Sequence, residues 1–219
     1  MDPRICPACR EIADRPLVRQ GDRRCDGCGH RWPFRRLPLF ALTGPSGAGK
    51  STVGAALVDR LHGRAVVLEQ DVLWTAGLRD DVDGHPAFRG TWLRMAAMIH
   101  QNGRPVVLCG TVVPPEFDPL PERALFSTIH YLALVADGDV LARRLRARPA
   151  WRQWDEPRIA EMLEFNAWLR KNAPSLGVDL FDTTHTSLEA TTEHVMSWLR
   201  KRLDRPESSP AEDHSPPKR

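Results

Sequence analysis

The stretch Gly44-Pro45-Ser46-Gly47-Ala48-Gly49-Lys50-Ser51 places glycine, lysine and serine at the spacing G-x-x-x-x-G-K-[ST]. It follows the apolar run 37–42 and opens the helically spaced segment 50–62. A glycine turn between a strand and a helix is the context in which this pattern cradles phosphate. The glycines let several backbone N–H groups point at one anion, and the helix adds the positive end of its dipole. Residues 44–51, together with Thr52, are therefore predicted to contact a nucleotide.

Two side chains of this loop have chemical roles that a purely structural turn would not need. The Lys50 ammonium would reach the β- and γ-phosphates, and the Ser51 hydroxyl would hold Mg²⁺. A glycine-rich turn that binds nothing is the alternative, but it gives no reason for lysine and serine at these offsets. We therefore expect ATP and Mg²⁺ as ligands.

Apolar runs separated by helically spaced segments predict the surrounding fold. These runs occupy residues 37–42, 65–68, 105–109, 129–135 and 178–182. Each run is continuously apolar and each is followed by a helical segment, which is typical of an α/β domain whose parallel sheet is covered on both faces. The sequence thus predicts a five-stranded parallel sheet with ligands bound at the carboxyl ends of its strands.

Four cysteines near the N-terminus form two C-x-x-C pairs, Cys6 with Cys9 and Cys25 with Cys28, fifteen residues apart. In a reducing compartment this spacing predicts a tetrahedral Zn²⁺ site with four thiolate ligands. Disulfides and a redox pair are the less favoured alternatives. The fifth cysteine, Cys109, lies in an apolar run and is expected to be a small buried side chain rather than a ligand.

These patterns divide the chain into three parts. A zinc ribbon is expected at 1–34 and a phosphate-loop domain at 37–203, with a lid at about 139–158. The junction between the first two parts is so short that the ribbon should pack against the larger domain. The segment 204–219 is rich in proline and serine, lacks apolar periodicity and is expected to be disordered.

Composition places the chain among soluble globular proteins, with 42% hydrophobic and 27% charged residues. No apolar run approaches the roughly 18 residues that a membrane span requires, and the N-terminus has no apolar signal core. A cytoplasmic location without membrane contact is therefore expected. A homodimer is left open.

Asp71 is the acidic residue that the predicted fold places nearest the transferred phosphate. It follows the second apolar run, at the carboxyl edge of the sheet. A carboxylate there could accept the proton of an attacking hydroxyl or help to hold Mg²⁺. The alternative is a surface carboxylate that caps the next helix.

Arginines after the fourth apolar run indicate a cationic lid. They are Arg143, Arg144, Arg146, Arg148 and, slightly further on, Arg152. Arg144 and Arg148 are four residues apart and so share one helix face, where they could offset the charge on a transferring phosphoryl group. A solvated basic helix is the alternative. GTPase signatures are missing: the chain has no Asn-Lys-x-Asp motif, and the third run ends in Cys109-Gly110 without an acid.

Residues 37–203 resemble the small P-loop phosphotransferases, a group that includes uridine, gluconate and shikimate kinases, adenylylsulfate kinase and chloramphenicol phosphotransferase. The matching stretches are 44–51, 70–71, 141–148 and 181–184. The resemblance implies a substrate-binding helical insert between strands two and three, an acceptor-side role for Asp71 and phosphate contacts from the lid arginines. It also implies that the loop around Thr184 borders the adenine. The zinc ribbon and Cys109 depart from the group's usual pattern.

Candidate acceptor contacts lie mainly in the insert. Trp74 could stack on a planar ring, and Arg79 or Arg89 could grip an anion. Glu116, after strand three, is expected to face the same site. Asn166 is a polar side chain on an otherwise apolar helix stripe, which indicates a ligand contact or a satisfied buried amide. Each of the others also has a structural alternative as a core or surface residue.

The leading hypothesis is an ATP-dependent kinase whose acceptor is a hydroxyl group of a small molecule, with a nucleoside or nucleoside-like compound favoured. A nucleic-acid 5′-hydroxyl kinase is the first alternative, and its support is a basic and aromatic run in the ribbon. That run comprises Arg23, Arg24, Arg31, Trp32, Phe34, Arg35 and Arg36. It is not favoured, because the net charge of the chain is only +3 and four thiolates on zinc would lower it further. A non-catalytic, nucleotide-gated adaptor is the second alternative.

Overall fold

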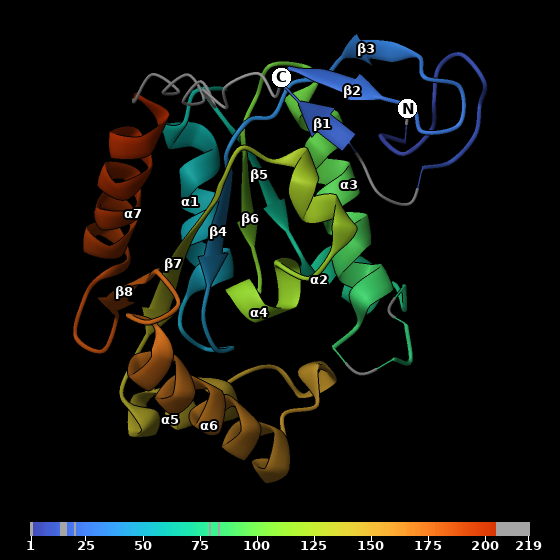
Figure 1. Cartoon of the computed structure of the whole chain (residues 1–219). Helices are drawn as coiled ribbons and strands as arrows, with labels where there is room; N and C mark the ends of the chain where they lie inside the picture. Colours follow the sequence, from blue (N-terminus) through green and yellow to red (C-terminus); the bar gives the residue numbers. More distant parts are fainter. Residues whose placement is uncertain (1, 14–16, 20, 79, 83, 205–219) are drawn as a thin grey trace.

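Five parallel strands form the larger of two sheets in the computed structural model, which describes residues 2–13, 17–19, 21–78, 80–82 and 84–204. Their order across the sheet is β5 (Val66–Glu69), β6 (Val106–Cys109), β4 (Leu39–Thr43), β7 (Ile129–Val135) and β8 (Val178–Asp182). The predicted five-stranded parallel sheet is thus confirmed, and the strand that precedes the phosphate loop lies at its centre (Figure 1). The predicted disordered segment, apart from Asp204, lies outside the described residues.

Helices cover both faces of this sheet, which explains why its central strands are apolar at every position. Alternate residues of β4 point to opposite sides: Leu39 and Ala41 belong to one buried cluster, Phe40 and Leu42 to the other. The first cluster lies under α3 (Pro86–His100), α4 (Pro114–Phe117) and the 3-10 helix η1 (Pro121–Leu125). The second lies under α1 (Lys50–Arg60) and α7 (Leu188–Leu203).

The helical insert between β5 and β6 consists of two helices, α2 (Asp71–Thr75) and α3. Backbone geometry separates them, since Gly77 and Gly84 have φ of 74° and 72°, His85 has φ of 48°, and Pro86 then starts α3. Positive φ ends a right-handed helix, and proline is well suited to a first helical position. The break places α2 at the carboxyl edge of the sheet, near the phosphate loop.

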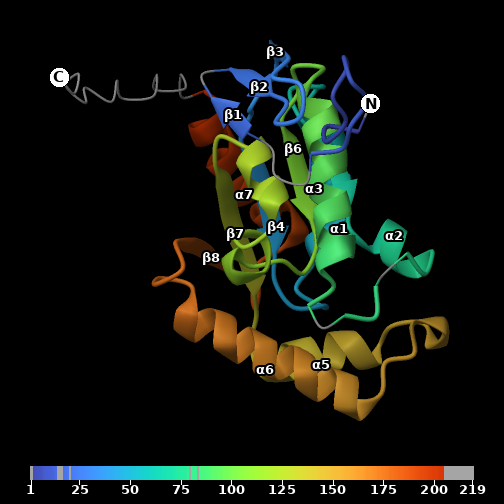
Figure 2. The same cartoon turned by 45° about the vertical axis from the view of Figure 1, so that its right-hand side comes forward.

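Two helices follow β7, and the first of them occupies much of the segment 139–158 in which a lid was expected. They are α5 (Gly138–Arg146) and α6 (Glu156–Asn172), joined through the 3-10 helix η2 (Ala150–Arg152). Both lie across the carboxyl end of the sheet (Figures 1 and 2). The Asp155 side chain accepts a hydrogen bond from the Arg158 N–H and caps the start of α6. Within the described ranges, no helix has the length and apolar character needed to cross a bilayer.

The smaller sheet is antiparallel and contains β1 (Leu17–Arg19), β2 (Asp22–Arg24) and β3 (Arg31–Pro33). It packs at the end of the molecule opposite α5 and α6 (Figures 1 and 2). Arg35 and Gln101 exchange two hydrogen bonds, of 2.9 and 3.1 Å, between the junction and the end of α3. Phe34 is 4% exposed and belongs to the main core cluster. The small sheet is therefore held against the larger body.

Candidate active site

The phosphate loop joins β4 to α1, and its first glycine permits a close approach to the neighbouring strand. Gly44 has φ of 132°, and a Cβ atom there would lie 2.1 Å from the Leu134 carbonyl oxygen. Gly47 and Gly49 have φ of 89° and 100°, and Gly49 occupies the N-cap position of α1. Residues other than glycine rarely adopt these backbone conformations. The spacing of glycines therefore follows from the curl of the backbone.

The Lys50 ammonium lies inside this curl. Its Nζ donates hydrogen bonds of 2.7 and 3.0 Å to the carbonyl oxygens of Gly44 and Pro45. Burial lowers the pKa of Lys50 to about 8, although the carboxylates of Asp71 and Glu69 oppose that shift. The side chain is thus still cationic at neutral pH and lies where a phosphate chain would enter.

A cavity of about 280 Å³ opens beside the loop. Its lining comes from the loop, the first turn of α1, α5 and the segment around the start of α7: Gly47, Ala48, Gly49, Thr52, Val53, Arg144, Arg148, Thr183, Thr186, Leu188 and Thr191. Two of the predicted lid arginines and Thr52 thus meet the loop at one cavity. Thr184 is not among the lining residues, and its hydroxyl accepts a hydrogen bond from the Asp137 N–H at 2.9 Å.

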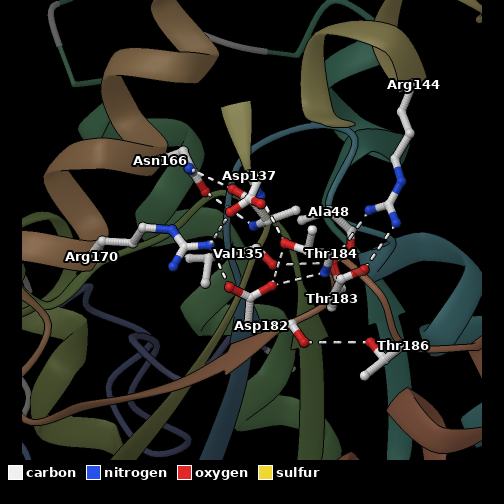
Figure 3. A network of polar contacts seen from close by, with 11 residues as sticks. Ala48, Val135, Asp137, Arg144, Asn166, Arg170, Asp182, Thr183, Thr184 and Thr186 are labelled. Carbon is white, nitrogen blue, oxygen red and sulfur yellow. Dashed lines mark hydrogen bonds and ion pairs between the residues drawn. The ribbon is translucent and has the colours of Figure 1, made fainter. Parts of the chain in front are cut away.

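Thr183 ties this cavity to the sheet, as Figure 3 shows. Its hydroxyl lies 3.0 Å from the Val135 carbonyl oxygen and 3.3 Å from that of Ala48. Its own carbonyl oxygen accepts a 2.9 Å hydrogen bond from Arg144. The sequence singled out Thr184 next to it, and only the fold reveals that the earlier threonine faces the loop.

The two cavity arginines have different surroundings. Arg144 is held by backbone carbonyl oxygens, since it contacts that of Gly47 at 3.4 Å in addition to that of Thr183. Arg148 has its guanidinium carbon 5.6 Å from the Trp154 ring centroid, and burial followed by the nearby Arg152 charge lowers its pKa. A cation held against an aromatic ring in a cavity is well placed to receive an anion.

Asp71 is the first residue of α2 and lies on the same edge of the sheet. Its carboxylate forms an ion pair of 3.7 Å with Arg152 and is 55% exposed. Burial lowers the pKa values of both Lys50 and Arg148, and the Asp71 charge opposes that lowering in each case. The three groups are therefore within electrostatic range of one another. The predicted acid, lysine and lid arginine therefore belong to one cluster. The exposed carboxylate leaves room for an acceptor.

Glu69 is a residue of this cluster that the sequence analysis did not select. It ends β5 and pairs in register with Cys109, at the strand end where the usual acid is missing. Burial raises the pKa of the Cys109 thiol to about 12, and the Glu69 carboxylate adds to that shift. A carboxylate on the adjacent strand thus lies beside the vacant acidic position. In the sequence, the pattern Glu-x-Asp at the end of a predicted strand could have indicated that Glu69 belongs to the site.

Arg89 of the insert and Glu116 are brought together, and the described candidate acceptor residues contact other protein groups. The Trp74 ring packs edge-on against His85 and Phe88, with centroid distances of 4.9 and 5.4 Å. Arg89 and Glu116 form an ion pair with one another. Arg79 lies outside the described residues.

Asn166 lies in α6 and is only 5% exposed. Its amide nitrogen donates to the Ala136 carbonyl oxygen at 2.8 Å, and its amide oxygen accepts from the Ala136 N–H at 3.3 Å. Figure 3 shows these bonds at the end of β7. They correspond to the structural alternative, a satisfied buried amide.

The four N-terminal cysteines converge in the small sheet. Their sulfur atoms all lie within 4.8 Å of one another, and the Cys6–Cys28 and Cys9–Cys25 separations are both 3.7 Å. A tetrahedral Zn²⁺ with Zn–S bonds of about 2.3 Å requires sulfur separations of about 3.8 Å. The donor set therefore fits zinc.

A buried guanidinium lies next to these sulfur atoms. Arg23 is 0% exposed, and its three nitrogens have no hydrogen-bond partner within the described part of the chain. The charges that act on it are those of Asp2, Cys25, Cys6 and Asp26. Four thiolates around one Zn²⁺ carry a net charge of −2, which an adjacent guanidinium would offset.

A family model described as an AAA domain matches residues 39–175, which is more than half of the chain. The chain belongs to this family.

Two curated relatives are shikimate kinases. That of Nitrobacter winogradskyi is 37% identical over 117 residues, which cover 50% of this chain and 52% of the relative. That of Chlorobaculum tepidum is 40% identical over 76 residues, which cover 33% of this chain and 40% of the relative. The chain thus spans about half or less of the length of these curated relatives.

Solved structures share the fold. A sugar kinase from Janibacter sp. HTCC2649 has a TM-score of 0.56 at 16% identity and covers 76% of this chain and 95% of its own. A gluconokinase from Sinorhizobium meliloti 1021 has a TM-score of 0.51 at 21% identity, with coverages of 76% and 94%. At these identities the comparison shows a shared fold alone.

Proposed function

We propose that this chain is an ATP-dependent phosphotransferase that moves the γ-phosphate of ATP to a hydroxyl group of a small molecule. The observation that carries the proposal is the cluster of Lys50, Arg148 and Asp71 at the mouth of the phosphate loop. A nucleotide-binding switch needs the lysine but has no use for an exposed acid facing it. The shikimate kinase relatives add support, since their name denotes the same reaction type.

In this proposal the cavity beside the loop receives the nucleotide. Backbone N–H groups of residues 44–51 surround the phosphates, and Arg144, held in place by Thr183, presents a flat cation to the purine. Lys50 exchanges the carbonyl oxygens of Gly44 and Pro45 for phosphate oxygens. The loop's own carbonyls thus keep the ammonium in position before ATP binds.

The divalent cation would be held by Ser51, with Glu69 as the second candidate ligand on the neighbouring strand end. The Ser51 side chain is exposed at the start of α1, and oxygen donors of this kind suit Mg²⁺. When bound, Mg²⁺ would supply charge neutralisation at the β- and γ-phosphates.

Asp71 would accept the proton of the acceptor hydroxyl as its oxygen attacks the γ-phosphorus. Arg148 and Arg152 are the two lid cations nearest that carboxylate and would offset the charge on the transferring group. Closure of the lid would also exclude water, which limits hydrolysis of ATP.

A nucleoside-like acceptor is the specific form of this proposal, because Trp74 offers an aromatic surface next to Asp71 on α2. The nucleic-acid alternative receives little support. Several of the seven basic and aromatic residues behind it have structural contacts: Arg23 is fully buried, Phe34 is in the core, and Arg36 donates to the Phe126 carbonyl oxygen at 2.7 Å. The ribbon also lies at the end of the molecule opposite α5 and α6 (Figure 1). A cytoplasmic location and a homodimer remain predictions.

The test is ATP consumption in the presence of a panel of nucleosides, sugars and oligonucleotides with free 5′-hydroxyl ends. The proposal expects turnover that depends on one class of small hydroxyl compound and is abolished in Lys50→Ala. Stimulation by oligonucleotides alone would favour the alternative. Calorimetry that detects no ATP binding at millimolar concentration would refute both.

A further inference from the structure

Arg89 was expected to grip an anion, but protein groups already engage its guanidinium. Nε donates to the Gly84 carbonyl oxygen at 2.6 Å, and Nη1 donates to the Thr111 carbonyl oxygen at 3.2 Å. Nη2 donates to the Glu116 carboxylate. Each of the three nitrogens thus has an acceptor within the protein, and burial lowers the pKa of Arg89 while Glu116 opposes that shift.

Glu116 is the more accessible member of this pair. Its side chain is 28% exposed, compared with 11% for Arg89. One carboxylate oxygen is bonded to Arg89, and the other accepts a 3.0 Å hydrogen bond from the Val113 N–H. The part of the pair that a ligand would meet is therefore the carboxylate and not the guanidinium.

The pair lies close to the reacting groups. Thr111, whose carbonyl oxygen holds Arg89, donates its N–H to the Gln70 side chain at 3.1 Å, and Gln70 directly precedes Asp71. The Thr111 hydroxyl also lies 3.4 Å from the Gly44 carbonyl oxygen of the phosphate loop. One residue thus connects the ion pair with both the proposed base and the nucleotide site.

Two further carboxylates lie on this side of the molecule, together with basic side chains. Asp71 contributes an exposed carboxylate, and its ion-pair partner Arg152 belongs to the lid. Asp80 accepts a hydrogen bond from the Phe88 N–H at 2.9 Å and exerts its charge on Arg89. His85, at the N-cap position of α3, lies within electrostatic range of the Glu116 carboxylate.

We propose that the Arg89–Glu116 pair selects acceptors that carry hydroxyl groups but no carboxylate, with Glu116 accepting a hydrogen bond from the bound compound. This rests on the proposed phosphotransferase function. An acceptor carboxylate would meet the Glu116 charge, and reaching Arg89 would require breaking a largely buried pair. A neutral hydroxyl group instead gains a charge-assisted hydrogen bond without disturbing the pair.

Matched compounds test this selection: shikimate against its methyl ester, and gluconate against sorbitol. Binding is measured by calorimetry with protein saturated with Mg²⁺ and a non-hydrolysable ATP analogue, and turnover is measured by ATP consumption. In the wild type, the neutral member of each pair is expected to be preferred by at least about tenfold, because like charges in a partly buried site repel strongly. Equal or tighter binding of the carboxylates would overturn the proposal.

Glu116→Gln provides the decisive variant, because it removes the negative charge and releases Arg89 for an incoming anion. It is expected to shift the ratio of carboxylate to neutral binding by at least about tenfold toward the carboxylate. An unchanged ratio overturns the proposal, including the case in which the variant gains no carboxylate binding.

Glu122→Gln is the matched control. Glu122 forms a similarly buried ion pair with Arg94, another α3 arginine, with a separation of 2.6 Å. Its loss is expected to lower stability without changing the ratio. ATP binding and turnover are measured first in each protein. Failure of the proposed function then appears as ATP that is not bound, or is bound but transferred to no compound, whereas failure of this inference appears as an unchanged acceptor ratio.

Discussion

Lys50 shows how one side chain combines burial with charge. Its ammonium is retained by the carbonyl oxygens of Gly44 and Pro45, yet burial brings its pKa down to about 8. Bound phosphate favours the protonated form and so raises this pKa. Nucleotide binding is therefore coupled to the protonation of a single lysine.

The first prediction follows from that coupling. At pH 7 and below the ammonium is almost fully protonated, because its pKa is about 8, so ATP binding should take up almost no proton through Lys50. As pH rises through 8, a growing neutral fraction must be protonated on binding, and uptake should approach about one proton near pH 9. Calorimetry in buffers of different ionisation enthalpy measures this. Lys50→Arg, whose side chain stays charged, should abolish the uptake; persistence of uptake would assign it elsewhere.

Asp71 carries the second prediction. Asp71→Asn keeps the side-chain shape but removes the proton acceptor, so kcat should fall by about 10²- to 10⁴-fold. The nucleotide Kd should change little, because the ion pair with Arg152 is largely exposed. Steady-state kinetics and calorimetry separate the two effects. Unchanged kcat would show that another group takes the proton.

At the scale of elements, α5 and the turn that follows it present two arginines to the cavity with distinct duties. Arg144 is bonded to Thr183 and Gly47, whereas Arg148 stacks near Trp154 and lies close to Asp71. Under the proposed function, this segment anchors one cation by hydrogen bonds and leaves the other for the reacting phosphate.

The third prediction is a split in kinetic effects along that segment. Arg144→Ala should raise KM for ATP by about tenfold with a small effect on kcat, since it removes ground-state contacts. Arg148→Ala should lower kcat by about 10²- to 10³-fold, since it removes charge stabilisation in the transition state. The exposed Arg143→Ala is the control and should leave both constants unchanged. The reverse pattern would exchange the two roles.

The fourth prediction concerns the contact between the phosphate loop and β7. In Gly44→Ala the new methyl group would meet the Leu134 carbonyl oxygen, which is backbone and cannot rotate away. The clash and positive φ together should lower Tm by about 5–10 °C. Gly177→Ala is the control, because Gly177 also has positive φ but a methyl group there would meet no described atom within 4 Å. A similar loss in both variants would attribute the effect to φ alone.

Elements were far more predictable from sequence than the pairings between them. The largely apolar run 129–135 predicted β7 with the bounds that the structure has, because a parallel strand inside the sheet is covered on both faces. The bounds of β8 were also predicted, although β8 lies at the edge of the sheet and contains two aspartates. The spacing of loop residues likewise predicted the turn before α1. Arg89 and Glu116, however, are 27 residues apart, and no local pattern indicates that the two would neutralise one another. The same applies to the proximity of Glu69 and Lys50, which depends on strand order.

At the scale of the whole molecule, the small sheet and the helices α5 and α6 lie at opposite ends of the larger sheet (Figure 1). The four cysteine sulfur atoms lie together beside the small sheet, and the Arg35–Gln101 bonds join that part of the chain to α3. The metal should therefore matter for folding more than for chemistry.

The fifth prediction is that purified protein contains about one Zn²⁺ per chain, in line with a four-thiolate site. Removing it with a chelator should lower Tm, because the site contributes folding free energy. At temperatures below the new Tm, KM for ATP should be unchanged. Metal analysis, thermal unfolding and kinetics test the three statements. The double variant Cys6→Ser with Cys25→Ser should reproduce the chelated state, and a zinc content unaffected by it would place the ion elsewhere.

The position of the ribbon has a mechanical consequence. A molecule or surface bound to β2 and β3 would not block ATP binding or product release near α5 and α6. Immobilised through its N-terminal sheet, the protein should therefore retain the freedom of its lid and turn over as it does in solution.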